Sequence, residues 1–131
     1  MTISKIAVVV LAAGLGTRMK SKLSKVLHPL AGRPMINHLM DTVDGLDPQE
    51  ITIVVGENMD DVSEAVLPFP TVVQSEQLGT AHAVIAAREC ISNFDGDVLV
   101  LFGDTPLITL ETLEALVNAR TSLLDPAVVV L

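Results

Sequence analysis

Short runs rich in valine, isoleucine and leucine alternate along this chain with segments patterned as helices. The apolar runs that predict strands cover residues 5–11, 51–55, 71–73, 98–102 and 127–131. The segments between them predict helices over residues 33–43, 60–67, 80–90 and 110–119. Such alternation favours right-handed β-α-β units, and therefore a parallel sheet with helices on both faces.

The expected architecture is an α/β fold: a Rossmann-like three-layer sandwich with a mostly parallel central sheet. Half of the 131 residues are hydrophobic, which is enough for one core. Residues 127–131 end the chain as an apolar run with no turn or helix after it, so we expect the domain to be incomplete at its C-terminus. Pro34 is expected in the first turn of its helix, and Thr80 and Thr109 are expected as N-caps.

The net charge of −8 hides an uneven distribution. Residues 1–40 contain no Asp or Glu but hold six of the eight basic residues, whereas all sixteen acids lie from Asp41 onward. A local positive region in an acidic protein suits a small polyanion. A nucleic-acid binder would need a broad basic face, so we expect no nucleic-acid partner.

The sequence also bears on membrane and redox context. No apolar run approaches the roughly 20 residues of a membrane span, and the N-terminal residues show no secretory cleavage pattern. We therefore expect no membrane partner and a cytoplasmic location. Cys90 is the single cysteine, so it cannot form an internal disulfide, and we expect it to be a buried structural thiol.

The strongest local feature is the loop after the first strand, where residues 11–19 read Leu-Ala-Ala-Gly-Leu-Gly-Thr-Arg-Met. This loop leaves the carboxyl end of its strand, the edge at which open α/β sheets bind ligands. Its small residues let the backbone approach a ligand, and successive N–H groups can form an anion-binding concavity. Arg18 can grip a phosphate through two parallel N–H bonds, and Lys25 adds a second, compact positive charge.

Two better-known phosphate-binding motifs do not fit this loop. A Walker P-loop requires G-x-x-x-x-G-K-[ST], which is absent here. The dinucleotide fingerprint requires a small residue where Met19 stands, and an acid at the end of the second strand, where Val55 and Gly56 stand. A dehydrogenase is therefore disfavoured.

Three further motifs accompany the loop: Lys-Val-Leu-His at residues 25–28, Gln-Ser-Glu-Gln-Leu-Gly-Thr-Ala-His-Ala at 74–83, and Phe-Gly-Asp-Thr-Pro-Leu at 102–107. In order and spacing the set resembles the sugar-phosphate nucleotidyltransferases. It is most similar to the bacterial bifunctional N-acetylglucosamine-1-phosphate uridyltransferase/glucosamine-1-phosphate acetyltransferase family. The resemblance covers essentially the whole chain. It implies the nucleotide-diphospho-sugar transferase fold, with residues 1–131 as the N-terminal, nucleotide-binding half of a nucleotidyltransferase (pyrophosphorylase) domain.

The resemblance implies nucleotidyl transfer from UTP to N-acetylglucosamine 1-phosphate. The products would be pyrophosphate and UDP-N-acetylglucosamine, a precursor for peptidoglycan and lipopolysaccharide. It also implies a Mg²⁺ cofactor held by Asp104, with a second protein ligand beyond position 131, so these residues alone are expected to be inactive. A homotrimer is expected only if a downstream acetyltransferase domain is present.

The same resemblance assigns roles to individual residues. Arg18 and Lys25 would be catalytic, stabilising charge on the transferring and leaving phosphates. Gln74 would read the edge of the uracil, since an amide offers both a donor and an acceptor. The expected nucleotide-binding set is Leu11, Ala12, Ala13, Gly14, Gly16, Thr17, Lys25, Gln74, Gly79, Thr80 and Gly103.

Several alternatives stay open from the residues alone. A cytidylyl-, guanylyl- or thymidylyltransferase would use the same fold, and a non-catalytic nucleotide-binding module would need the same loop. Asp104 could make an Asx turn, which is a common role for an aspartate in this setting. Gln74 could be an ordinary polar residue at a strand end, and His82 is expected to be a packing or helix-surface residue.

Overall fold

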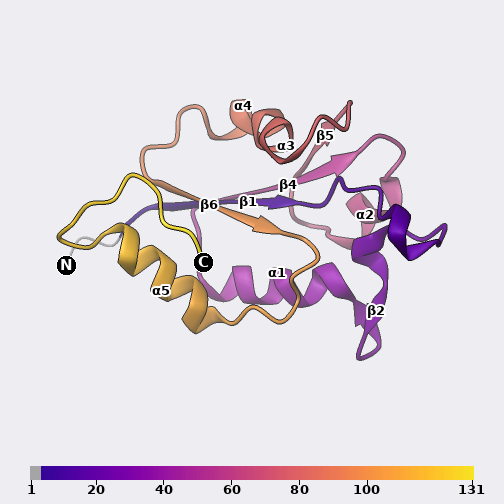
Figure 1. The fold of residues 1–131 in the computed structure, drawn as a ribbon, viewed down its shortest axis with the longest axis horizontal. Coiled ribbons are helices and arrows are strands. Elements are labelled where there is room, and N and C mark those ends of the chain that lie inside the picture. Colours follow the sequence, from indigo (N-terminus) through magenta and orange to yellow (C-terminus); the bar gives the residue numbers. More distant parts are fainter. Residues whose placement is uncertain (1–3) are drawn as a thin grey trace.

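In the computed structural model, which describes residues 4–131, four strands form a parallel sheet in the order β5-β4-β1-β6 (Figure 1). Helices α1 and α5 lie on one side of this sheet, and α3 and α4 lie on the other (Figure 1). The predicted α/β, Rossmann-like architecture is therefore confirmed. The elements are β1 (Ile6–Leu11), η1 (Thr17–Met19), η2 (Lys25–Leu27), β2 (Pro29–Leu30), β3 (Arg33–Pro34), α1 (Met35–Gly45), β4 (Glu50–Gly56), α2 (Asp60–Ala65), β5 (Thr71–Gln74), α3 (Thr80–Ala86), α4 (Arg88–Ile91), β6 (Asp97–Phe102) and α5 (Leu110–Arg120).

The central strands β1 and β4 are buried on both faces. Val8 and Val10 belong to the larger core cluster, which includes residues of α1, α2 and α5. Val9 and Val54 belong to the smaller cluster, which includes residues of α3. Because successive side chains of a strand point to opposite faces, a strand covered on both sides must be apolar at nearly every position.

The strand order creates a switch point at β1. From β1 the chain places β4 and β5 to one side and β6 to the other. The parallel ladders pair Leu11 with Val54 and with Phe102, so the three strands end at the same edge of the sheet. In open α/β sheets the crevice outside such carboxyl ends is where ligands bind.

The helix predicted over residues 33–43 begins later than expected. Arg33 and Pro34 form β3, and Pro34 is extended, with φ −53° and ψ 138°, just before the helix begins at Met35. Arg33 Nη1 also lies 2.7 Å from Asp41 Oδ2, which ties the hairpin to α1. The hydrogen bond from Arg33 lowers the pKa of the Asp41 carboxyl below its ordinary value.

The single helix predicted over residues 80–90 is instead two short helices, α3 and α4. The N–H of Ala87 donates to the Val84 carbonyl at 3.1 Å, and this tight i→i+3 bond ends α3. Ala83, Ala87 and Ile91 pack against the same core cluster, so the i, i+4 spacing of the sheet-facing residues continues across the break. Ile91, and not Cys90, is the residue of α4 that packs against this cluster, so Cys90 is exposed and the prediction of a buried thiol is wrong.

The two predicted threonine caps have different outcomes. Gly79, with φ 101° and ψ −178°, occupies the N-cap of α3, and Thr80 is the first helical residue. Thr109 caps α5 as predicted, because its side chain accepts from the N–H of Thr112.

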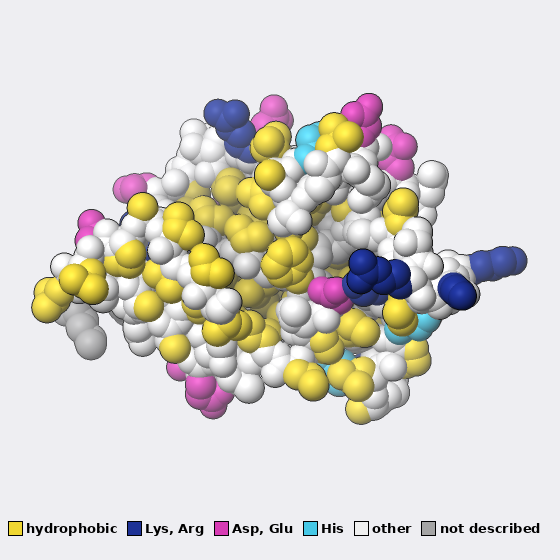
Figure 2. Space-filling view, viewed as in Figure 1, with side chains coloured by type: hydrophobic (Ala, Val, Ile, Leu, Met, Phe, Trp, Pro, Cys, Tyr) yellow, Lys and Arg dark blue, Asp and Glu magenta, His cyan; other side chains and the backbone are white. Residues whose placement is uncertain are grey.

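Residues 127–131 are not a strand, contrary to the sequence prediction. A strand needs a hydrogen-bonding partner, and within residues 4–131 this segment pairs with none. It lines an apolar groove together with β6 and α5. Much of the hydrophobic surface of this face lies in the centre and left of Figure 2. Among the described residues, no helix is both long enough and apolar enough to span a bilayer.

Candidate functional site

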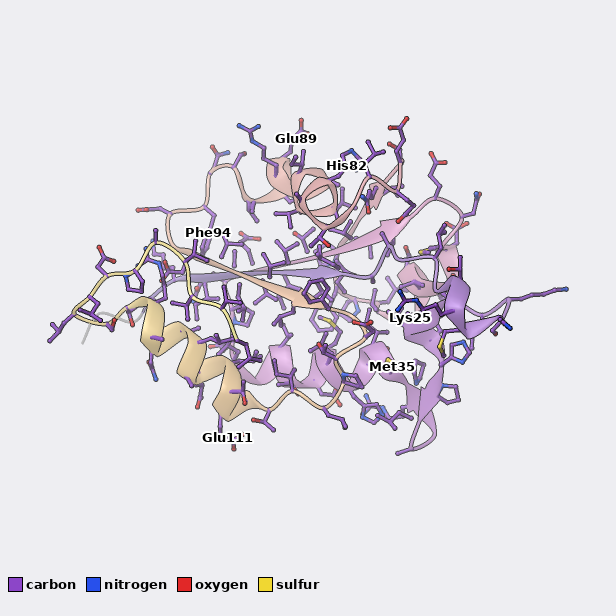
Figure 3. All side chains as sticks on the ribbon, viewed as in Figure 1. Lys25, Met35, His82, Glu89, Phe94 and Glu111 are labelled. Carbon is purple, nitrogen blue, oxygen red and sulfur yellow. The ribbon has the colours of Figure 1, made fainter. Side chains whose placement is uncertain are left out.

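A cavity of about 240 Å³ opens at the carboxyl edge of the sheet. Lys25 lies at this edge, whereas Phe94 lies toward the other end of the strands (Figure 3). Four segments build the cavity: the loop after β1, η2, the connection from β5 into α3, and the turn after β6. Its lining residues are Leu11, Ala12, Ala13, Gly14, Lys25, Val26, Gln74, Gln77, Gly79, Thr80, Ala83, Phe102 and Asp104.

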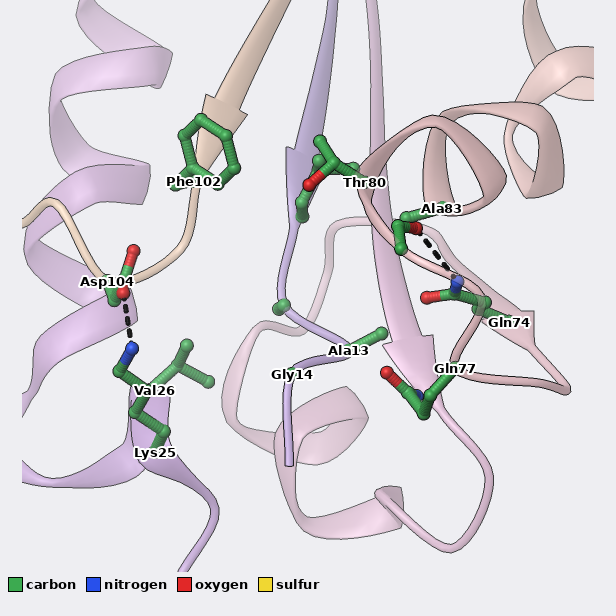
Figure 4. A pocket seen from close by; sticks show the side chains of 13 residues that line it. Ala13, Gly14, Lys25, Val26, Gln74, Gln77, Thr80, Ala83, Phe102 and Asp104 are labelled. Atoms are coloured by element: carbon green, nitrogen blue, oxygen red, sulfur yellow. Dashed lines mark hydrogen bonds and ion pairs between the residues drawn. The ribbon is translucent and has the colours of Figure 1, made fainter. Parts of the chain in front are cut away.

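One end of the cavity holds an ion pair between Lys25 and Asp104 (Figure 4). Lys25 Nζ donates to Asp104 Oδ2 at 2.6 Å, although the two residues are 79 positions apart in the sequence. Their side chains are 39% and 35% exposed, so the pair adds at most about 1 kcal/mol to stability. They are the only charged side chains among the residues that line the cavity, whose formal charge is therefore zero.

The other end of the cavity holds the Gln74 amide. This residue ends β5 and is only 3% exposed. Its Nε2 donates to the carbonyl of Gly79 at 3.3 Å and lies 3.0 Å from Nδ1 of His82. The small residues Ala13 and Gly14 lie between this amide and the ion pair (Figure 4). The cavity thus has a neutral polar end, a backbone-lined middle and a charged end.

Most of the predicted site residues line this cavity, but four do not. Arg18 is exposed on η1 and is not among the lining residues. Thr17 is exposed on the same short helix. Gly16 and Gly103 also lie outside the lining, and they contribute through packing.

Gly16 and Gly103 allow segments around the cavity to approach closely. Gly16 has φ +60°, and a Cβ placed on it would lie 2.7 Å from the Cβ of Lys25. A Cβ on Gly103 would lie 3.0 Å from Cγ1 of Val26 and 3.1 Å from the Leu11 carbonyl oxygen. These contacts indicate that the two glycines hold the loop after β1, η2 and the end of β6 together.

Replacing Gly16 with alanine is expected to lower the free energy of unfolding by about 1–3 kcal/mol and to displace Lys25. The left-handed backbone disfavours a Cβ, and the close contact adds to the strain. Thermal melting measures the first effect. Gly14→Ala is the matched control, because a Cβ there meets nothing within 4 Å and its stability should change little. Equal melting temperatures for Gly16→Ala and wild type would contradict the packing role.

Four lining residues were not in the predicted set. Val26 and Ala83 are buried and shape the walls, and Phe102 lines the cavity from the end of β6. Gln77 adds a second amide to the lining. The Nε2 atom of Gln77 would lie 3.2 Å from a Cβ placed on Gly56. All four lie within the motifs at residues 25–28, 74–83 and 102–107, which were the available sequence signal.

Solved structures share this fold. The TM-score is 0.76 against an Rv0371c homologue from Mycobacterium sp. strain JC1, at 22% identity, covering 88% of this chain and 59% of that one. Rv0371c from Mycobacterium tuberculosis H37Rv in complex with manganese gives 0.66 at 19% identity, covering 90% and 60%. The chain is therefore a Rossmann-like α/β domain whose cavity lies at the topological switch point.

The chain belongs to the MobA-like NTP transferase domain family, which it matches over residues 8–131. It is 61% identical over 131 residues, the whole of this chain, to the "Bifunctional protein GlmU" of Paramagnetospirillum magneticum. It spans 29% of the length of that relative. The resemblance predicted from the motifs is confirmed.

Proposed function

We propose that the protein containing this chain joins UTP to N-acetylglucosamine 1-phosphate, forming UDP-N-acetylglucosamine and pyrophosphate. The 61% identity to a protein named GlmU across the chain supports this assignment. Residues 1–131 would be the N-terminal, nucleotide-binding part of the nucleotidyltransferase domain. The product would supply cell-wall precursor synthesis, and the cytoplasmic location expected from the sequence stays a prediction.

The proposal depends on one observation: segments far apart in sequence bring a buried amide, a small-residue loop and a Lys–Asp pair to one cavity. Gln74 stands at one end, Ala13 and Gly14 in the middle, and Lys25 with Asp104 at the other end (Figure 4). The order of these groups along the cavity suits a nucleotide that lies with its base at Gln74 and its phosphates at Lys25. Because Ala13 and Gly14 have little or no side chain, the ribose can lie close to the backbone there.

The proposed reaction is an in-line displacement at phosphorus. A phosphate oxygen of the sugar phosphate forms a bond to the α-phosphorus of UTP, and the bond from that phosphorus to the bridging oxygen breaks. The electron pair leaves with pyrophosphate. Because the attacking phosphate is already ionised, no general base is needed, and catalysis consists of positioning and charge neutralisation. Lys25 would leave Asp104 and stabilise negative charge on the phosphates of UTP.

Asp104 fits the role of a carboxylate ligand for Mg²⁺. Its Oδ2 already accepts a cationic partner, the ammonium group of Lys25, at the open end of the cavity. Mg²⁺ prefers one or two carboxylates completed by phosphate oxygens and water. Within residues 4–131, no three His, Cys, Asp or Glu side chains cluster as a metal site, which agrees with the expectation of a second protein ligand beyond position 131 and of further ligands from the nucleotide. When bound, Mg²⁺ would neutralise charge on the phosphate oxygens.

Nucleotide protection against thermal unfolding tests the base and the substrate class. With Mg²⁺ present, UTP at ten times its dissociation constant should stabilise the chain by about 1.4 kcal/mol, which raises Tm by roughly 4 °C for a domain of this size. UTP should protect more than CTP or GTP at equal concentration, while dTTP presents the same base edge as UTP. A preference for GTP would contradict the uridine assignment. Turnover by the 131 residues alone would contradict the expectation that their site is incomplete.

A further inference from the structure

The orientation of the Gln74 amide is determined by its neighbours. The carbonyl of Gly79 can only accept a hydrogen bond, so the amide atom 3.3 Å from it must be the donor nitrogen, Nε2. A flipped amide would place two acceptor oxygens against each other. The contact with Gly79 therefore assigns the amide without reference to a ligand.

His82 accepts a hydrogen bond from the second hydrogen of the same NH₂ group. Nε2 of Gln74 lies 3.0 Å from Nδ1 of His82, and a donor nitrogen there requires Nδ1 to accept. The imidazole is then neutral and carries its proton on Nε2. His82 reaches Gln74 from the first turns of α3, and Figure 3 shows it on the face of the sheet opposite α1.

These two contacts leave only the amide oxygen for a ligand. Both Nε2 hydrogens are directed at protein acceptors, and no described residue donates to Oε1. Gln74 lines the cavity, and its oxygen lies on the side of Ala13 (Figure 4). The amide thus presents an acceptor alone. Uracil offers an N–H donor at N3, whereas cytosine offers a lone pair at the same position, which would repel the amide oxygen.

We propose that His82 is a positioning residue for base selection: by accepting from Gln74 Nε2, it holds Oε1 toward the cavity and so favours uracil over cytosine. This inference rests on the proposed nucleotide-binding function. It assigns to His82 a role in specificity in place of the packing role expected from the sequence. It also predicts that uracil and thymine are not distinguished at this contact, since both present N3–H.

The test compares UTP and CTP binding to the wild-type chain, His82→Leu and His82→Asn by NMR titration, which detects millimolar affinities. Leucine removes the acceptor, so the ratio of the CTP to the UTP dissociation constant is expected to fall about tenfold. Asparagine can place Oδ1 near the position of Nδ1, so His82→Asn should restore most of the ratio. In the same wild-type sample, long-range ¹⁵N–¹H spectra of the imidazole should show the proton on Nε2.

The outcomes separate this inference from the proposed function. An unchanged UTP preference in His82→Leu would overturn the role of His82 while leaving the proposed function intact. A wild-type imidazole with its proton on Nδ1 would overturn it as well, without any need for a variant to fold. Failure of the complete protein to bind either nucleotide would overturn the proposed function, together with the inference that depends on it.

Discussion

Replacing Lys25 with alanine is expected to lower kcat/KM of the complete enzyme by about 10²–10³-fold, because it removes the positive charge proposed to stabilise the leaving phosphates. The change also leaves Asp104 without its partner, so the formal charge of the cavity lining falls from zero to −1. A polyanionic nucleotide would then meet a net negative surface. Steady-state kinetics with UTP and N-acetylglucosamine 1-phosphate measure the effect.

Stability should be almost unaffected by the Lys25 substitution, since the ion pair is partly exposed to solvent. Lys22→Ala is the matched control, because Lys22 is an exposed lysine just before η2 that does not line the cavity. Its kinetics should stay within about twofold of wild type. Near-normal turnover in Lys25→Ala would remove Lys25 from the proposed catalytic set.

Arg18 is a separate case, because the sequence predicts it in the same site as Lys25 but it does not line the cavity. A steep fall in kcat/KM for Arg18→Ala would mean that the loop after β1 carries Arg18 to the phosphates when the nucleotide binds. Turnover equal to that of Lys22→Ala would mean that Arg18 belongs to the exposed basic surface.

Replacing Asp104 with asparagine is expected to lower turnover at fixed Mg²⁺ by at least about 10²-fold, because the side chain keeps its shape but loses the charge that would hold the metal. The reason is electrostatic. A neutral amide is a much weaker ligand for a hard divalent cation, and Lys25 is released from its ion pair. The dependence of rate on Mg²⁺ concentration should therefore shift to higher concentrations. Metal-free UTP should bind no more weakly than it does to wild type.

Glu111→Gln is the matched control for the Asp104 variant. Glu111 is exposed on α5 and lies far from Lys25 (Figure 3). The Glu111→Gln variant loses the same charge at a position outside the cavity, so the Mg²⁺ dependence of its rate should equal that of wild type. If Asp104→Asn also shows a wild-type Mg²⁺ profile, Asp104 is not a metal ligand.

The local patterns of the sequence were sufficient for most of the fold. Strands and helices appear in the predicted order, because burial on both faces demands the apolar runs of β1 and β4. The predictions that were wrong concern contacts with segments distant in sequence. Residues 127–131 have strand composition but no strand beside them. Cys90 is exposed because its neighbour Ile91 takes the position that packs against the core.

The sequence by itself determined the strand–loop–helix order, the small-residue loop after β1, and the presence of an amide and an aspartate at the ends of β5 and β6. These are local properties of short segments, readable from residue type and period. Only the tertiary structure decided that Lys25 contacts Asp104, that Arg18 lies outside the cavity, and that Gly79 and His82 orient Gln74. Each of these depends on how strand register and loop packing set distances between side chains from different segments, and no local pattern encodes such distances.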